Sequence, residues 1–302
     1  MAFNFLQFAV PHGKGLIRFS DIIFDQLSIP QLLIYSTLVA IMFVALIVHV
    51  VLTALFIKGL LGWIADKTAP SKLLNDPYQN VTVFPIIGSL AMSASVFWSP
   101  AGFFIPQIAE NLQALMLPSL LYFVILWSAG FALEWKVVKV WFATSAKTDK
   151  FNFVWLLDAF VFGLVSLAGS GIAATSVNPD ISAFAIAGTA LSVLIGLAIF
   201  VVKLTLLITA LIKTKRLYDN PVLPAFFLVV PIACLYGLSL FRVASYFQTF
   251  LQINISGTIA FIMSFSYFIA VGWVIFAVFL LGYYFKNYFL KSNYSAPQWG
   301  IV

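Results

Sequence analysis

Residues 221–247, with the sequence PVLPAFFLVVPIACLYGLSLFRVASYF, form a short apolar stretch broken by three prolines, and a longer apolar stretch, 254–290, follows it closely. The same pair of stretches recurs about every 70 residues along the chain. The earlier short members lie at 81–100 and 152–174, and the earlier long members lie at 107–141 and 182–213. Recurring apolar segments with broken members are typical of repeat-built transporters and channels. The pattern therefore predicts three helical hairpins, each with a broken inner helix and a long outer helix.

The composition indicates an integral membrane protein. Of the 302 residues, 63% are hydrophobic and only 9% are charged, which is more apolar surface than a water-soluble chain of this length could bury. The segment 31–60 is a further apolar stretch, and at about 20 residues per crossing the chain has about seven spans. We therefore expect an all-α integral membrane protein with about seven transmembrane helices.

Basic residues predict the orientation of these helices. The loops at 101–106, 175–181 and 248–253 contain no lysine or arginine, whereas the alternate loops are rich in lysine and also hold Arg216. Since lysine and arginine in short loops stay on the cytoplasmic side, we expect the N-terminus outside and the C-terminus inside. The same loops account for the net charge of +6, so this charge gives no reason to expect nucleic-acid binding.

Three regions are expected along the chain. Residues 1–30 form an N-terminal segment, residues 31–290 form the transmembrane domain, and residues 291–302 form a cytoplasmic tail. Within the first region, residues 16–27 carry apolar side chains at helical spacing with charges on the opposite face. This spacing predicts an amphipathic helix at the outer membrane interface. Docking of the segment on the bundle or on a partner chain is the alternative.

Arg242 is the strongest candidate for a functional residue. It lies in the third short segment, beside Ser239 and Phe241, and an arginine within a membrane span is costly unless it is paired or hydrated. A cation that faces an interior cavity would attract an anion. The alternatives are that Arg242 snorkels to the headgroups or pairs with Glu110.

A path for a small anion is expected between the three short helices, with hydroxyl groups replacing part of the hydration shell of the ion. The serines that would line this path are Ser89, Ser93, Ser166, Ser170 and Ser239. A phenylalanine that projects into such a path could close it by steric block and dewetting. The candidate gates are Phe97 and Phe241.

Four further polar residues lie in the apolar segments. Asp158, in the first turns of the second short helix, could take up a proton or a cation, but we favour its complementing the helix dipole or pairing with a lysine of the loop 143–150. Lys203 is expected to snorkel to the interface. Glu134 is expected to mark the cytoplasmic boundary. His49 is favoured as a packing residue, with a quinone site as the alternative.

No residue pattern predicts an enzyme or a cofactor. A single histidine lies in a membrane segment, which does not support haem ligation by two transmembrane histidines. The chain contains one cysteine, so it has no disulfide and no thiolate metal cluster. Ser-His-Asp, Walker and HExxH patterns are missing from the sequence. We therefore expect no catalytic site and no bound cofactor.

The starts of the short helices resemble those of the tellurite-resistance and dicarboxylate transporter superfamily, which includes the plant slow-type anion channels. The residues that carry this likeness are Phe84-Pro85-Ile86-Ile87-Gly88 and the run from Pro221 to Pro231. The likeness implies inner helices surrounded by outer ones in successive hairpins, commonly as trimers with one phenylalanine-gated pore in each subunit.

A closer resemblance, over roughly residues 35–215, is to the TsoY-like membrane (seleno)proteins of bacteria. It rests on His49, on Pro85 followed by Met92-Ser93, on Phe104-Ile105-Pro106, and on Asn152-Phe153. This resemblance implies a location in the bacterial inner (plasma) membrane.

The leading hypothesis is a channel or carrier for a small anion or weak acid, working in the lipid bilayer as a homo-oligomer or with partner subunits. The alternative is a structural or anchoring subunit of a larger membrane complex. A membrane oxidoreductase that holds haem or quinone is the weakest of the three hypotheses.

Overall fold

The computed structural model describes residues 2–13, 15–66, 68–144, 146–214, 217–289, 291 and 294–301. Within these residues, seven helices are long and apolar enough to cross a membrane. The spans are Ile29–Ala65, Asn80–Phe104, Met116–Ala143, Phe153–Thr175, Pro179–Thr214, Asn220–Phe250 and Ser256–Leu280. The expected all-α membrane fold is confirmed.

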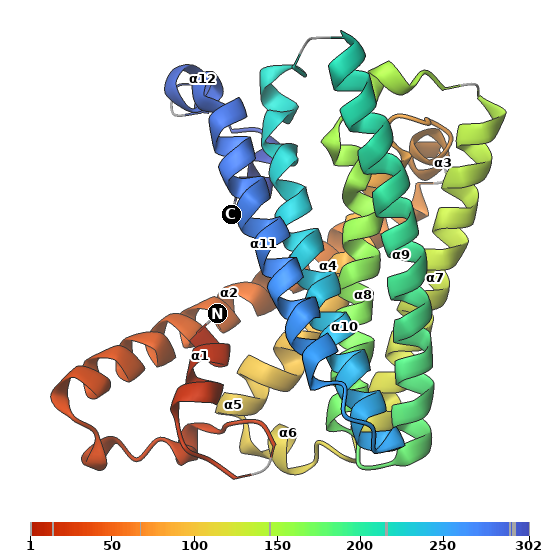
Figure 1. Cartoon of the computed structure of the whole chain (residues 1–302). Coiled ribbons are helices and arrows are strands. Elements are labelled where there is room, and N and C mark those ends of the chain that lie inside the picture. Colours follow the sequence, from red (N-terminus) through yellow and green to blue (C-terminus); the bar gives the residue numbers. More distant parts are fainter. Residues whose placement is uncertain are drawn as a thin grey trace.

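The predicted hairpins form as three antiparallel helix pairs (Figure 1). The first pairs α4 (Phe84–Val96) with α7 (Met116–Ala143), the second pairs α8 (Leu157–Thr175) with α9 (Pro179–Thr214), and the third pairs α10 (Val229–Leu251) with α11 (Ser256–Leu280). The short and long segments of the sequence are therefore the two arms of each hairpin.

Each inner helix begins with a 3₁₀ segment. These segments are Asn80–Val83, Phe153–Leu156 and Asn220–Leu228. Pro221 and Pro224 lie within the third of these segments, and Pro85 lies in the first turn of α4, directly after the first segment. Proline suits the start of a helix, because the first turn leaves its N–H groups without an intrahelical partner. The other end of α4 is also irregular, since it continues into a π-helical turn, Phe97–Ala101, that contains Pro100.

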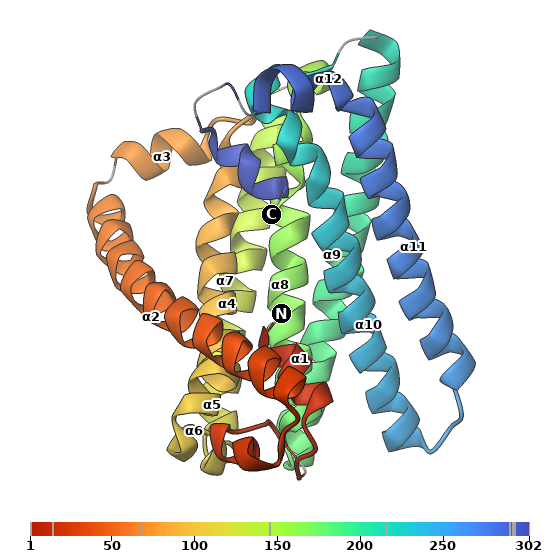
Figure 2. The same ribbon diagram turned by 90° about the vertical axis from the view of Figure 1, so that its left-hand side faces the viewer.

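The inner helices stand in a row, with α8 in contact with both α4 and α10 (Figure 2). The buried share of the most apolar part of each span differs between the inner helices. It is 78% in the span that contains α8, 61% in the span that contains α10 and 33% in the span that contains α4. Glycines allow the close approach of α8 to its neighbours, because a Cβ at Gly163 would lie 3.1 Å from Leu235. The middle of the row is therefore the centre of the molecule.

The long helices mostly face outward. In α2 (Ile29–Ala65) and in α11, only 6% of the most apolar part of the helix is buried. Helix α2 crosses the row of inner helices diagonally (Figure 2). The 36 residues of α9 span about 54 Å, more than the roughly 30 Å of a bilayer core. The last long segment is shorter than the expected 254–290, since α11 ends at Leu280 and a separate turn, α12 (Gly282–Tyr284), follows.

The N-terminal segment differs from its predicted form. The prediction of an amphipathic helix at residues 16–27 is wrong. These residues form two 3₁₀ turns, Phe19–Asp21 and Phe24–Gln26, and the α-helix of this segment is α1 (Ala2–Ala9). Apolar side chains of the segment pack on α2 and on the turn after α4. This small core includes Phe3, Leu6, Ile17, Tyr35 and Phe103. A short helix has little stability of its own, so packing of these apolar side chains against α2 and the turn after α4 outweighs helix formation. The apolar residues of the segment therefore form a docking surface.

Candidate functional site: two charged sites at opposite ends of α8

Three charged side chains from three helices meet near the start of α8. They are Glu134 of α7, Asp158 of α8 and Lys203 of α9, and their residues are 7%, 0% and 4% exposed. Lysine, aspartate and glutamate are rarely buried inside a membrane domain unless they face one another or a hydrated cavity. We call these three residues the acid–base cluster.

The centre of the cluster is an ion pair between Lys203 Nζ and Asp158 Oδ2. Lys203 Nζ also donates a hydrogen bond to the carbonyl of Trp155 at 3.1 Å and lies 4.6 Å from the centre of its indole ring. The other carboxylate oxygen of Asp158 accepts from the backbone N–H of Ala159 at 2.7 Å. The lysine that pairs with Asp158 is therefore Lys203 and not one of the loop 143–150, and Asp158 lies in the first turn of α8, where a carboxylate complements the helix dipole. Lys203 turns into the bundle instead of snorkelling outward.

Glu134 completes the cluster as a second carboxyl group beside Asp158, and it has no ion-pair partner among the described residues. Its Oε2 is buried and has no hydrogen-bond partner among the described residues, while Asp158 and Lys203 are the charged groups that act on it. The side chain lines a cavity of about 230 Å³ that also touches Lys203 and Trp155. Glu134 therefore faces the interior of the bundle.

A second polar site lies toward the other end of α8. Arg242 Nη1 donates to the carbonyl of Leu167 at 3.2 Å and to the hydroxyl of Ser170 at 3.3 Å. No described carboxylate lies within 4 Å of Arg242, and Glu110 instead pairs with Arg18 at 3.7 Å. The expected pairing with Glu110 is therefore wrong, and the arginine is half-buried without a counter-charge in the described part of the chain.

A stripe of polar residues on α10 connects the two sites. Tyr236, Ser239 and Arg242 recur every third residue, which places them along one side of the helix. The Tyr236 hydroxyl donates to the carbonyl of Ala159, next to the cluster, at 2.6 Å. Ser239 is fully buried, and its hydroxyl has no partner among the described residues. We call this contact between α8 and α10 the polar seam.

Glycines allow closer packing at one end of the polar seam than at the other. A Cβ at Gly196 would overlap the hydroxyl of Tyr236, so only glycine admits the tyrosine there. At the other end, Gly171 of α8 leaves a gap of 3.7 Å between an added Cβ and Arg242 Nη1. The seam thus narrows toward the cluster and is less tightly packed beside the arginine.

The other serines predicted to line the path are Ser89, Ser93 and Ser166. They lie on α4, on the opposite side of α8 from α10, or donate their hydroxyl to a carbonyl of their own helix. Ser89 and Ser93 line a cavity of about 520 Å³ between α2, α4 and α8, together with His49. The hydroxyl of Ser166 is buried and donates to the carbonyl of Phe162 at 2.7 Å. The structure therefore brings Arg242, Ser170 and Ser239 together on the seam and sets Ser89 and Ser93 apart from them.

The two candidate gate residues also lie in different places. Phe97 is 43% exposed in the π-helical turn and lines a cavity of about 310 Å³ with Ser93. Phe241 is half-buried on α10, directly before Arg242. Of the two, Phe241 is the one adjacent to the polar seam.

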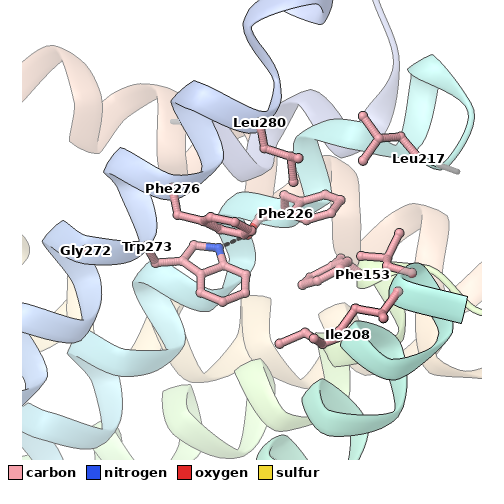
Figure 3. A pocket seen from close by; sticks show the side chains of 10 residues that line it. Phe153, Ile208, Leu217, Phe226, Gly272, Trp273, Phe276 and Leu280 are labelled. Carbon is pink, nitrogen blue, oxygen red and sulfur yellow. Dashed lines mark hydrogen bonds between the residues drawn. The ribbon is translucent and has the colours of Figure 1, made fainter. Parts of the chain in front are cut away.

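The cavity of about 670 Å³ between α9, α11 and the 3₁₀ segments before α8 and α10 offers no ion site (Figure 3). Its lining is aromatic and aliphatic, with Phe153, Phe226, Trp273 and Phe276 around the opening. The indole N–H of Trp273 is already donated to the carbonyl of Phe226 at 2.7 Å. Such a lining suits a hydrocarbon chain and gives an ion nothing to bind.

The sequence contained one signal for the acid–base cluster. Glu134, Asp158 and Lys203 are charged residues in three successive apolar segments, and such charges usually face each other inside a bundle. Comparisons with protein-family models, with curated proteins and with solved structures give no match for this chain. The fold and the sites thus define its class as an all-α integral membrane protein with buried charges.

Proposed function

We propose that this membrane protein transports a small anion or weak acid, with Arg242 as the residue that attracts it. The observation that carries the proposal is an arginine inside the membrane domain whose described neighbours offer hydroxyl and carbonyl oxygens but no carboxylate. A guanidinium group carries five N–H donors, and the described residues bond only Nη1. The remaining donors and the positive charge favour an anionic ligand.

The surroundings of Arg242 suit a small hydrated anion. The hydroxyl of Ser239 has no partner among the described residues and can donate to the ion in place of water. The Ser170 hydroxyl instead donates to the Leu167 carbonyl at 3.0 Å and helps to hold Arg242. Phe241, directly before the arginine, is the candidate gate of this path. The resemblance of the proline-bearing helix starts to those of anion channels supports the same function.

Anion flux through liposomes that contain the purified protein tests the proposal. A panel of chloride, nitrate, formate and acetate should reveal at least one anion that enters faster than into empty liposomes. Arg242→Gln should lower this flux about tenfold or more, since a lost charge contact of about 1.4 kcal/mol corresponds to a factor of ten. Arg242→Lys should retain part of the flux, because the charge remains.

The matched control is Arg18→Gln, which removes an exposed arginine that already pairs with Glu110. Its flux should equal that of the unaltered protein. Equal flux through Arg242→Gln and the unaltered protein would show that the arginine does not serve the anion.

The alternative function, an anchoring subunit, has one supporting observation. The long helix α2 contacts the bundle mainly through α1, α3 (Thr68–Leu74) and the π-helical turn, and most of its surface is uncovered. Native mass spectrometry after gentle solubilisation separates the two functions. Other subunits bound stably to the 33.4 kDa chain would favour the anchor, whereas an isolated homo-oligomer would favour the transporter.

A further inference from the structure

We propose that Glu134, Asp158 and Lys203 form an exchangeable proton site, and that loading of this site drives uptake of the anion bound at Arg242. The first part stands on the geometry of the acid–base cluster. The second part rests on the proposed function.

The charges of the cluster do not cancel without a proton. Two carboxylates meet one ammonium group, so the fully ionised cluster carries one negative charge in the interior of the bundle. Lys203 is bonded to Asp158 and to the Trp155 carbonyl, which leaves Glu134 Oε2 without a hydrogen-bond partner among the described residues. One proton on Glu134 makes the cluster neutral and removes the cost of the uncompensated charge.

No other described group facing the cluster can supply this proton. From α10, the nearest polar group is the Tyr236 hydroxyl, whose hydrogen is donated to the Ala159 carbonyl. From the 3₁₀ segment before α8, Trp155 presents a carbonyl and a ring face. On α7 itself, Lys136 and Lys139 are exposed on the outside of the bundle. The proton must therefore come from water.

The cavity beside Glu134 gives water access to the cluster. Its volume of about 230 Å³ holds several water molecules. Glu134 and Lys203 lie on its wall, and Pro77 and Trp141 lie toward the end of the bundle where α3 (Thr68–Leu74) is found. By the charge of the loops, this is the cytoplasmic end. In the proton step, the O–H bond of Glu134 breaks, the proton passes to a water molecule in the cavity, and the cluster changes from neutral to one negative charge.

The two sites share one helix and one seam, which allows them to act together. Asp158 and Ser170 are twelve residues apart on α8, or about 18 Å along its axis. Tyr236 contacts the start of this interval and Arg242 contacts its end. With a proton on Glu134 and an anion on Arg242, both ends of the seam are neutral. This paired loading predicts electroneutral uptake of one proton with each monovalent anion.

Two measurements on the full-length protein test the proposal separately. In liposomes, an imposed pH gradient should accumulate the transported anion above its equilibrium level, and Glu134→Gln should abolish accumulation while retaining downhill anion exchange. The matched control is Glu110→Gln, an exposed glutamate outside the cluster, which should accumulate the anion normally. Accumulation by Glu134→Gln equal to that of the unaltered protein, or accumulation driven by a sodium gradient instead of protons, would overturn the coupling.

Infrared difference spectroscopy tests the proton site without any anion flux. Raising the pH should remove a protonated-carboxyl band from the spectrum of the unaltered protein and of Glu110→Gln, and this band should be missing in Glu134→Gln. An unchanged band in Glu134→Gln would overturn the site, whatever the flux experiments show. If Glu134→Gln does not fold, Glu134→Asp should move the pH at which the band disappears, and an unmoved transition would equally overturn the site.

Discussion

The two ends of α8 hold buried charges in opposite ways. At the start of the helix, Asp158 and Lys203 neutralise each other and only Glu134 is left without a partner. At the other end, Arg242 contacts a serine and a carbonyl and has no described counter-charge. A charge that is paired by the fold contributes to folding, whereas a charge that the fold leaves unpaired is available to a ligand. This difference is the basis of the two proposals, a proton-binding role for the cluster and a ligand-binding role for Arg242.

Removal of Lys203 should have the largest effect on stability of any change at the two ends of α8. Lys203→Met should lower the free energy of unfolding by about 3–5 kcal/mol, because it leaves two buried carboxylates without a cation. Reversible unfolding in mixed detergent micelles measures this loss. Lys139→Met is the control: Lys139 is exposed over the ring of Trp135 at 5.0 Å, so its loss should cost less than about 1 kcal/mol. Equal stability of the two variants would show that the ion pair does not hold the cluster together.

The close packing between the two ends can be tested at Gly196. Gly196→Ala should cost about 1–3 kcal/mol, since the added Cβ would overlap the Tyr236 hydroxyl and approach Phe162 to 2.8 Å. Gly59→Ala, in the exposed helix α2 where nothing lies within 4 Å of an added Cβ, should instead stabilise the protein by up to about 1 kcal/mol. Adding Tyr236→Phe to Gly196→Ala should recover part of the loss. No recovery would place the clash elsewhere.

Arg242 should behave differently from Lys203 in the same stability assay. Arg242→Gln removes two hydrogen bonds from a half-buried group and strands no carboxylate among the described residues. We therefore expect a loss of less than about 1.5 kcal/mol together with the large loss of flux. A loss as large as that of Lys203→Met would remove the contrast between the two ends and would point to a structural arginine.

Substitution of Tyr218 shows the effect of a buried neutral polar group, for comparison with the effect of the buried charges. Its hydroxyl is buried without a described partner near Phe153, and burial raises the pKa of Tyr218 to about 12. Because the folded state holds this proton more tightly, any linked stability is constant below pH 10 and falls as the pH rises from 10 to 12. Tyr218→Phe should change stability at pH 7 by less than about 1 kcal/mol. Ultraviolet titration of tyrosinate should show the group that ionises near pH 12 only in the unaltered protein.

The hairpins were predictable, and parts of the N-terminal segment were not. The prolines and the length of each apolar stretch depend only on local sequence, so most ends of the paired short and long helices were found within four residues. The exceptions are α7, which begins at Met116 and not at 107, and α11, which ends at Leu280 and not at 290. The spacing at 16–27 suggested a helix, but Ile17 and Ile22 are drawn into a small core with Tyr35 and Phe103. Tertiary packing overrode the local pattern there, because a short helix has little stability of its own.

The sequence by itself determined that this chain is an all-α membrane protein with seven spans in inner and outer hairpins, since hydrophobicity and length are properties of each segment taken alone. It also pointed to Arg242, Asp158 and Lys203, because any charge in an apolar segment is conspicuous. Only the tertiary structure decided that Asp158 pairs with Lys203, that Glu134 joins them, and that Arg242 has no described acidic partner. These neighbours come from helices far apart in the chain, and the energy of a charge depends on what surrounds it in space.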